Sequence, residues 1–117
     1  MPYMLLIVEP VGQRASRSEQ EGRELYDIML RFADSLKERG LLLNAQSLRS
    51  DADGVRVQVR DGKRTHIDGP FAEAKEIVGG FFLLDCDDRD LALEIAAQCP
   101  AAEWATVEVR ELGPCFT

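Results

Sequence analysis

One apolar run, Gly79-Gly80-Phe81-Phe82-Leu83-Leu84-Asp85-Cys86, sets the architecture that we expect for this chain. Polar and apolar residues do not alternate in Phe81–Cys86, which is typical of a strand with two buried faces. A second run of this kind, Tyr3–Glu9, lies near the amino end. The two runs therefore indicate the inner pair of strands in a sheet that is covered on both sides.

The remaining elements have the patterns of ordinary helices and strands. Ser18 and Glu21 form a capping-box signature, and the apolar residues at helical spacing after it predict a helix that stops at Gly40. Asp87 or Asp88 can cap a second helix. Further strands are predicted at Leu41–Arg49, Val55–Arg60, Lys63–Asp68 and Ala105–Leu112. The dipeptide Asp-Gly at 61–62 favours a two-residue hairpin turn between the middle two of these strands.

This order of elements predicts an α+β fold, the ferredoxin-like split βαβ arrangement with an inserted β-hairpin. The chain has 117 residues, 45% of them hydrophobic, which suits a single domain over residues 1–117. Two helices can cover only one face of a sheet, yet the inner strands are apolar on both. We therefore expect a homodimer in which the sheets of two copies pack against each other.

Composition narrows the class of partner and the compartment. A net charge of −7 opposes binding to a nucleic-acid backbone or to an anionic membrane surface. The three cysteines have no C-x-x-C spacing, so reduced thiols in a cytoplasm are expected rather than a disulfide framework or a zinc knuckle. No signal peptide or membrane span is indicated, because every apolar run is too short. We expect a cytoplasmic protein with no cofactor, since phosphate-binding glycine loops are absent. No metal site is assigned, because a single histidine excludes poly-histidine sites, although carboxylates could still bind a hard cation weakly.

A polar bend, Asp68-Gly69-Pro70-Phe71-Ala72-Glu73-Ala74-Lys75-Glu76, joins the hairpin to the run at 79–86. Gly69 permits a φ above zero and Pro70 fixes its own φ, so the chain should turn sharply here. Residues 72–76 favour one helical turn. We expect a ligand-binding cleft beside this bend, between the sheets of the two copies, with Phe71, Glu73 and Lys75 as ligand-binding residues.

His66 is the only histidine, and in a strand it lies on the same side as Asp68. The pair could act as a general acid and base near neutral pH, which makes His66 and Asp68 the candidate catalytic residues. The plain alternatives are that His66 is a surface residue and that Asp68 only holds its own turn through backbone hydrogen bonds.

Other residues allow two interpretations. Arg14, Arg17 and Arg23 could meet an anionic ligand, although a solvated loop and helix face explains them more simply. The aromatic residues are interpreted as core or interface: Tyr3, Phe71, Phe81, Phe82 and Trp104.

With its bend at 68–76, the chain resembles the YCII-related family, and specifically the branch that carries an Asp-Gly-Pro-Phe (DGPF) motif. The likeness extends over nearly the whole chain. Its further segments are Tyr3-Met4-Leu5-Leu6-Ile7, Val57-Gln58-Val59-Arg60-Asp61-Gly62-Lys63, Gly79-Gly80-Phe81-Phe82-Leu83-Leu84-Asp85 and Val107-Glu108-Val109-Arg110. The resemblance implies a dimeric α+β barrel, in agreement with the homodimer expected from the strands.

The resemblance leaves two functions open. One is the binding or transformation of a small molecule near the motif, by His–Asp acid–base chemistry. The alternative is a non-enzymatic dimeric interaction or regulatory module, because members of the branch are often linked by gene context to extracytoplasmic-function sigma factors. Where YCII-like proteins have an assigned His–Asp site, the histidine lies near the first helix. Residues 11–36 contain no histidine here, so His66 would have to take that place.

Overall fold

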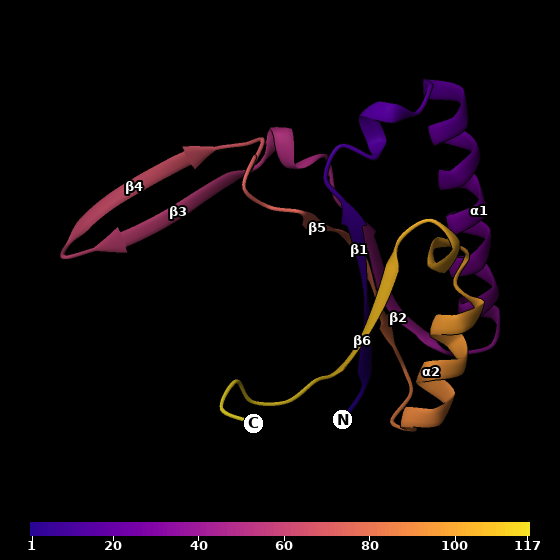
Figure 1. Cartoon of the computed structure of the whole chain (residues 1–117). Helices are drawn as coiled ribbons and strands as arrows, with labels where there is room; N and C mark the ends of the chain where they lie inside the picture. The colour runs from indigo at the N-terminus through magenta and orange to yellow at the C-terminus, as the bar shows by residue number, and fades with distance from the viewer.

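A computed structural model describes residues 1–117, and the chain forms a four-stranded antiparallel sheet with two α-helices on one face (Figure 1). The strands are β1 (Tyr3–Pro10), β2 (Leu42–Ser47), β3 (Val55–Arg60), β4 (Lys63–Asp68), β5 (Glu76–Leu84) and β6 (Thr106–Glu111). The helices are α1 (Glu19–Glu38) and α2 (Arg89–Gln98), with short 3-10 turns η1 (Arg14–Ser16), η2 (Asp51–Asp53) and η3 (Pro100–Glu103). The strand order β2-β5-β1-β6 confirms the ferredoxin-like α+β fold.

Local signals in the sequence define the ends of these elements. The Ser18 side chain accepts a hydrogen bond from the Glu21 amide, and the Glu21 side chain accepts one from the Ser18 amide. These two bonds complete the capping box of α1. The Asp88 carboxylate caps α2. The hairpin turn has positive φ at both central residues, 52° at Asp61 and 74° at Gly62, as a two-residue turn of this type requires.

The core lies between the sheet and the two helices. Leu5 and Leu84 on the sheet meet Leu36 of α1 and Ile95 of α2, and all four side chains are fully buried. Each fully buried aliphatic side chain stabilises the fold by about 1.5–3 kcal/mol relative to an exposed one. No helix of the protein has both the length and the apolar character needed to cross a membrane.

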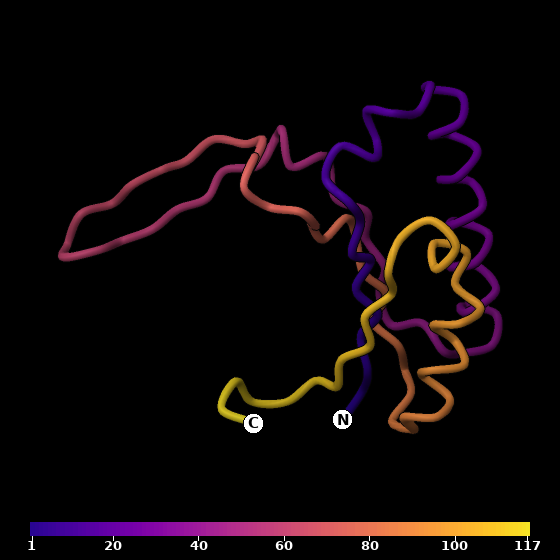
Figure 2. The backbone as a smooth tube through the Cα atoms, viewed as in Figure 1, coloured from indigo at the N-terminus to yellow at the C-terminus, as the bar shows by residue number.

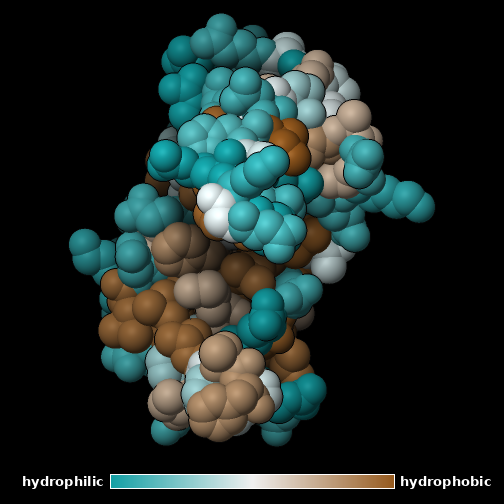
Figure 3. All heavy atoms as spheres, turned by 90° about the vertical axis from the view of Figure 1, so that its left-hand side faces the viewer, coloured by the Kyte–Doolittle hydropathy of each residue, from teal (hydrophilic) through white to brown (hydrophobic).

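The opposite face of the sheet has no covering layer within the chain. β1 alternates between buried residues on the helix side and half-buried residues on the other side, namely Met4, Leu6 and Val8. Phe81 and Leu83 of β5 pair with Leu6 and Met4, so they share that second face. Figure 3 shows apolar atoms gathered there, below the hydrophilic hairpin. The expectation of two apolar faces is therefore met in the inner strands, but only one of the faces is packed.

The hairpin β3–β4 projects away from the sheet as an arm (Figures 1 and 2), and every residue of both strands is exposed. The radius of gyration is 16.0 Å. A compact chain of this length has a radius of about 13 Å. The arm therefore accounts for an extended shape, and a two-stranded hairpin of this kind gains little stability alone.

The bend between the arm and β5 differs from the sequence prediction. No helical turn forms over residues 72–76; a single turn is closed by the Ala74 amide donating to the Phe71 carbonyl at 3.0 Å. Glu76 instead begins β5, because it pairs with Pro10 of β1. This tertiary pairing overrides the helix propensity of the segment. The strand predicted from Phe81 thus starts five residues earlier and ends at Leu84.

Gly69 is required at the bend for a different reason from the one expected. Its φ is not in the left-handed region, and the Gly69–Pro70 peptide bond is cis. A Cβ atom on Gly69 would overlap the Asp51 carbonyl oxygen and lie 2.9 Å from the Asp51 carbonyl carbon. The absence of a side chain, rather than a positive φ, is what lets the bend pack against η2.

Candidate functional site

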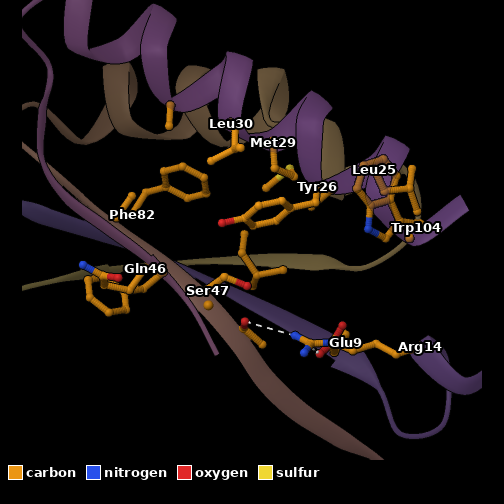
Figure 4. A pocket seen from close by; sticks show the side chains of 18 of the residues that line it. Glu9, Arg14, Leu25, Tyr26, Met29, Leu30, Gln46, Ser47, Phe82 and Trp104 are labelled. Carbon is orange, nitrogen blue, oxygen red and sulfur yellow. Dashed lines mark hydrogen bonds and ion pairs between the residues drawn. The ribbon is translucent and has the colours of Figure 1, made fainter. Parts of the chain in front are cut away.

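A pocket of about 380 Å³ lies between α1 and the helix-covered face of the sheet, and Figure 4 shows it from close by. Its volume is near the lower end of the range of small-molecule sites, about 300–1,000 Å³. The lining residues come from β1, η1, α1, β2, β5 and η3. The pocket is thus assembled from most of the domain rather than from one loop.

Apolar side chains of α1 form one wall. Tyr26, Met29 and Leu30 point from the helix toward Phe82 of β5 (Figure 4), and Ala33 continues the same wall. The spacing of three and four residues places them on one helix face. Tyr26 and Leu30 are 52% and 45% exposed, so they lie toward the open side. This wall suits an apolar ligand body.

A buried ion pair occupies another part of the lining. Glu9 is the last inward-facing residue of β1, and its side chain is only 8% exposed. Arg14 of η1 places Nη2 2.8 Å from Glu9 Oε1. The contact is an ion pair without the alignment of a hydrogen bond, because no donor reaches Oε1 with suitable geometry. Glu9 therefore keeps hydrogen-bonding capacity at the pocket.

Arg14 also ties three segments together. Its Nη1 donates to the Leu48 carbonyl at 2.6 Å, and its Nη2 donates to the Gly79 carbonyl at 3.2 Å. Gly79 leaves the space that the pair needs, since a Cβ there would overlap Glu9 Oε1 and lie 2.8 Å from Arg14 Nη2. The ion pair thus depends on a glycine that is distant in sequence.

Trp104 is placed at the pocket by the loop after β1. The Gln13 side-chain amide donates to the Trp104 carbonyl at 2.6 Å. Trp104 is the only tryptophan of the chain. Its indole therefore provides an internal fluorescence signal for anything that enters the pocket.

The pocket lining carries few charged groups. Glu9 is the only carboxylate in the lining, and Arg14 and Arg17 are the only cations. Glu9 is consequently the one acidic group at the pocket. No three His, Cys, Asp or Glu side chains come together as a metal-ligand group.

Burial encloses two of the three cysteine thiols. Cys86 and Cys99 are buried and Cys115 is exposed. Desolvation raises the pKa of the Cys99 thiol, with smaller opposing contributions from backbone hydrogen bonds at Ala101 and Ala102. Cys99 therefore behaves as a core residue in its protonated form.

The two residues predicted to be catalytic lie on the arm, outside this pocket. His66 and Asp68 are exposed residues of β4, two positions apart, and pair across the hairpin with Val57 and Val55. They share one side of the strand, as the sequence predicted. The Asp68 carboxylate accepts no hydrogen bond; Asp51 Oδ2 instead accepts from the Phe71 amide at 3.2 Å. Holding the bend is thus a function of Asp51, and the catalytic assignment of the pair stays a prediction.

The three residues predicted to bind a ligand also lie outside the pocket. Phe71 is half-buried, with the Arg56 guanidinium 3.9 Å from its ring centroid, so it anchors the base of the arm. Glu73 and Lys75 are exposed on the bend. The Lys75 carbonyl accepts from the Val11 amide at 3.0 Å, which fixes the bend to the end of β1. Ligand binding by these residues stays a prediction.

Sequence reasoning missed the ion pair, although one signal was present. Glu9 follows Tyr3, Leu5 and Ile7 at intervals of two, so strand periodicity places it on their buried face. The solvated interpretation is wrong for Arg14, which is ion-paired and lines the pocket. It holds for Arg23, which is exposed and pairs with Glu19.

Comparison with known proteins gives a family but no activity. An uncharacterized protein of Rhizobium meliloti (strain 1021) is 45% identical to the chain over 54 residues. The matched segment covers 44% of this chain and 44% of that protein. The model of the YCII-related domain matches residues 1–115. On that match, which spans almost the whole sequence, the chain belongs to the YCII-related domain family.

Proposed function

We propose that this protein binds a small, mainly apolar molecule in the pocket between α1 and the sheet. The observation that carries the proposal is the buried Glu9–Arg14 pair at an otherwise apolar cavity. A buried ion pair contributes little net stability compared with apolar residues of similar volume. Its presence beside a cavity of ligand size is better explained by a role toward a bound molecule.

The DGPF segment supports this site indirectly. β5 leaves the bend at Glu76 and reaches Gly79 three residues later, where it leaves room for the ion pair. Contacts from Asp51 and Val11 fix the bend. The motif, which also supports placing the chain in the DGPF branch, therefore sets the position of the strand that borders the pocket.

Binding of the neutral probe 2-naphthamide tests the proposal. About 0.3 kcal/mol per non-hydrogen atom over roughly 13 atoms predicts a Kd of about 1 mM. Saturable change in Trp104 fluorescence is expected, because this residue lines the pocket. Ala33→Phe should abolish the change by filling the cavity, since Ala33 is a half-buried lining residue.

A control variant separates occupancy of the pocket from surface binding. Ala72→Phe adds the same ring at an exposed position on the bend. It should bind the probe as the unmodified protein does, and thermal melting verifies that both variants fold. A fluorescence change that is not saturable, or that survives in Ala33→Phe, contradicts the proposal.

We also infer a homodimer through the uncovered sheet face, the arrangement that the family resemblance implies. The apolar residues Met4, Leu6, Phe81 and Leu83 lie at the centre of this face. Polar residues from the two outer strands border them, including Glu108 beside Leu6. An apolar centre with a polar border is typical of a protein–protein interface. This face and the arm also favour the alternative function, a non-enzymatic interaction module.

Sedimentation tests the dimer. A particle of about 26 kDa is expected at micromolar concentration, twice the 13.1 kDa of one chain. Leu6→Arg should give the single chain, because each copy would bring a charged guanidinium group into the apolar centre of the interface. Leu93→Arg is the matched control, since Leu93 is exposed on α2. A 13.1 kDa particle for the unmodified protein would refute the inference.

A further inference from the structure

The charges that line the pocket do not cancel. Glu9 contributes one negative charge, and Arg14 and Arg17 contribute two positive charges, so the lining carries a net charge of +1. The whole chain has a net charge of −7. The net negative charge of the whole protein repels anionic ligands at long range. A positively charged pocket in such a protein therefore indicates a local role for its cations.

Arg17 supplies the uncompensated charge. Arg14 is neutralised by Glu9 at 2.8 Å, whereas Arg17 forms no ion pair and its side chain donates no hydrogen bond within the protein. Arg17 is nevertheless half-buried. Its backbone is fixed immediately before the first turn of α1, because the Arg17 amide donates a hydrogen bond to the Arg14 carbonyl at 3.2 Å.

The geometry points to a ligand that is a small carboxylic acid, with its carboxylate bound by Arg17 and its apolar body against α1. This inference rests on the proposed function and names the chemical class of its ligand. A guanidinium binds a carboxylate through two parallel hydrogen bonds, and partial burial strengthens the attraction. The apolar wall of Tyr26, Met29 and Leu30 excludes small inorganic anions as the preferred ligand, because they would leave that wall unfilled.

A pair of probes of the same shape tests the charge alone. 2-Naphthoate and 2-naphthamide differ mainly in the charge of one group, and their affinities are measured by titration calorimetry and Trp104 fluorescence. Naphthoate is expected to bind about tenfold more tightly or better, as charge-assisted hydrogen bonds imply. The preference should weaken as the salt concentration rises.

Arg17→Gln should remove the preference and leave the affinity for naphthamide nearly unchanged. Arg23→Gln is the matched control, because it removes the same charge from an exposed position near the start of α1. It should keep the preference. If the probes bind equally to the unmodified protein, or if the preference survives in Arg17→Gln, the carboxylate inference fails while the pocket proposal stands. If neither probe binds, both proposals fail.

Discussion

Replacing Arg14 by methionine is expected to lower the free energy of unfolding by about 3 kcal/mol, the lower end of the cost of breaking a buried ion pair. The lower end applies because the Arg14 side chain is 35% exposed, whereas the Glu9 side chain is 8% exposed. The variant leaves the Glu9 carboxylate charged, enclosed and without its cation. Urea denaturation at one fixed protein concentration measures the change.

A second Arg–Glu pair in the same protein provides the control. Arg23 and Glu19 are also 2.8 Å apart, but their side chains are 77% and 80% exposed. Arg23→Met should change the stability by less than about 1 kcal/mol, as for other surface pairs. Equal effects of the two substitutions would show that burial does not distinguish the pairs.

A double variant identifies the cause of the loss. Glu9→Gln in the Arg14→Met background removes the lone charge, and should recover more than half of the lost stability. If nothing is recovered, the loss comes from the hydrogen bonds of Arg14 to Leu48 and Gly79 instead.

Gly69→Ala is expected to destabilise the protein by about 3 kcal/mol, the upper end of the usual cost of overpacking. The added Cβ would overlap the Asp51 carbonyl oxygen, which belongs to the backbone and cannot rotate away. The bend would have to move away from η2 to remove this overlap. Amide hydrogen exchange should then show faster exchange at the base of the arm, where the Gly69 amide donates to the Gly54 carbonyl at 2.8 Å.

Two substitutions serve as controls for this prediction. Gly113→Ala makes the same chemical change where the nearest atom to the new Cβ is Thr117 Oγ1 at an ordinary 3.4 Å, so it should be nearly neutral. Asp68→Ala should also be nearly neutral, because the Asp68 carboxylate holds no bond of the bend. A Gly69→Ala variant as stable as Gly113→Ala would mean that the bend adjusts without cost.

The sequence predicted those parts of the fold that depend on short-range signals. The capping box at Ser18 and the turn at residues 61–62 are each specified within four residues, and both form as expected. The two apolar runs form the inner pair of strands, β1 and β5, as expected. The helical turn predicted at 72–76 does not form, because the segment is positioned by the pairing of Glu76 with β1 rather than by its own helix propensity.

The pocket depends on contacts that no local pattern contains. Glu9 and Arg14 are close in sequence, but their burial requires Gly79, 65 residues after Arg14. Judged by its polarity alone, Arg14 would be assigned to a solvated loop. Only the placement of β5 beside β1 encloses it. The predicted His66 and Asp68, by contrast, were correctly placed on one side of a strand, but that strand stands away from the core.

The closed base of the arm allows two parts of the protein to diverge separately. The hydrogen bond from the Gly69 amide to the Gly54 carbonyl joins the residue after β4 to the residue before β3. The arm is thus closed at its base before β5 begins. Residues 55–68 could therefore lengthen, shorten or change their side chains without shifting the strands that shape the cavity. The surface of the arm and the lining of the cavity would then be inherited as independent traits, each with its own rate of change.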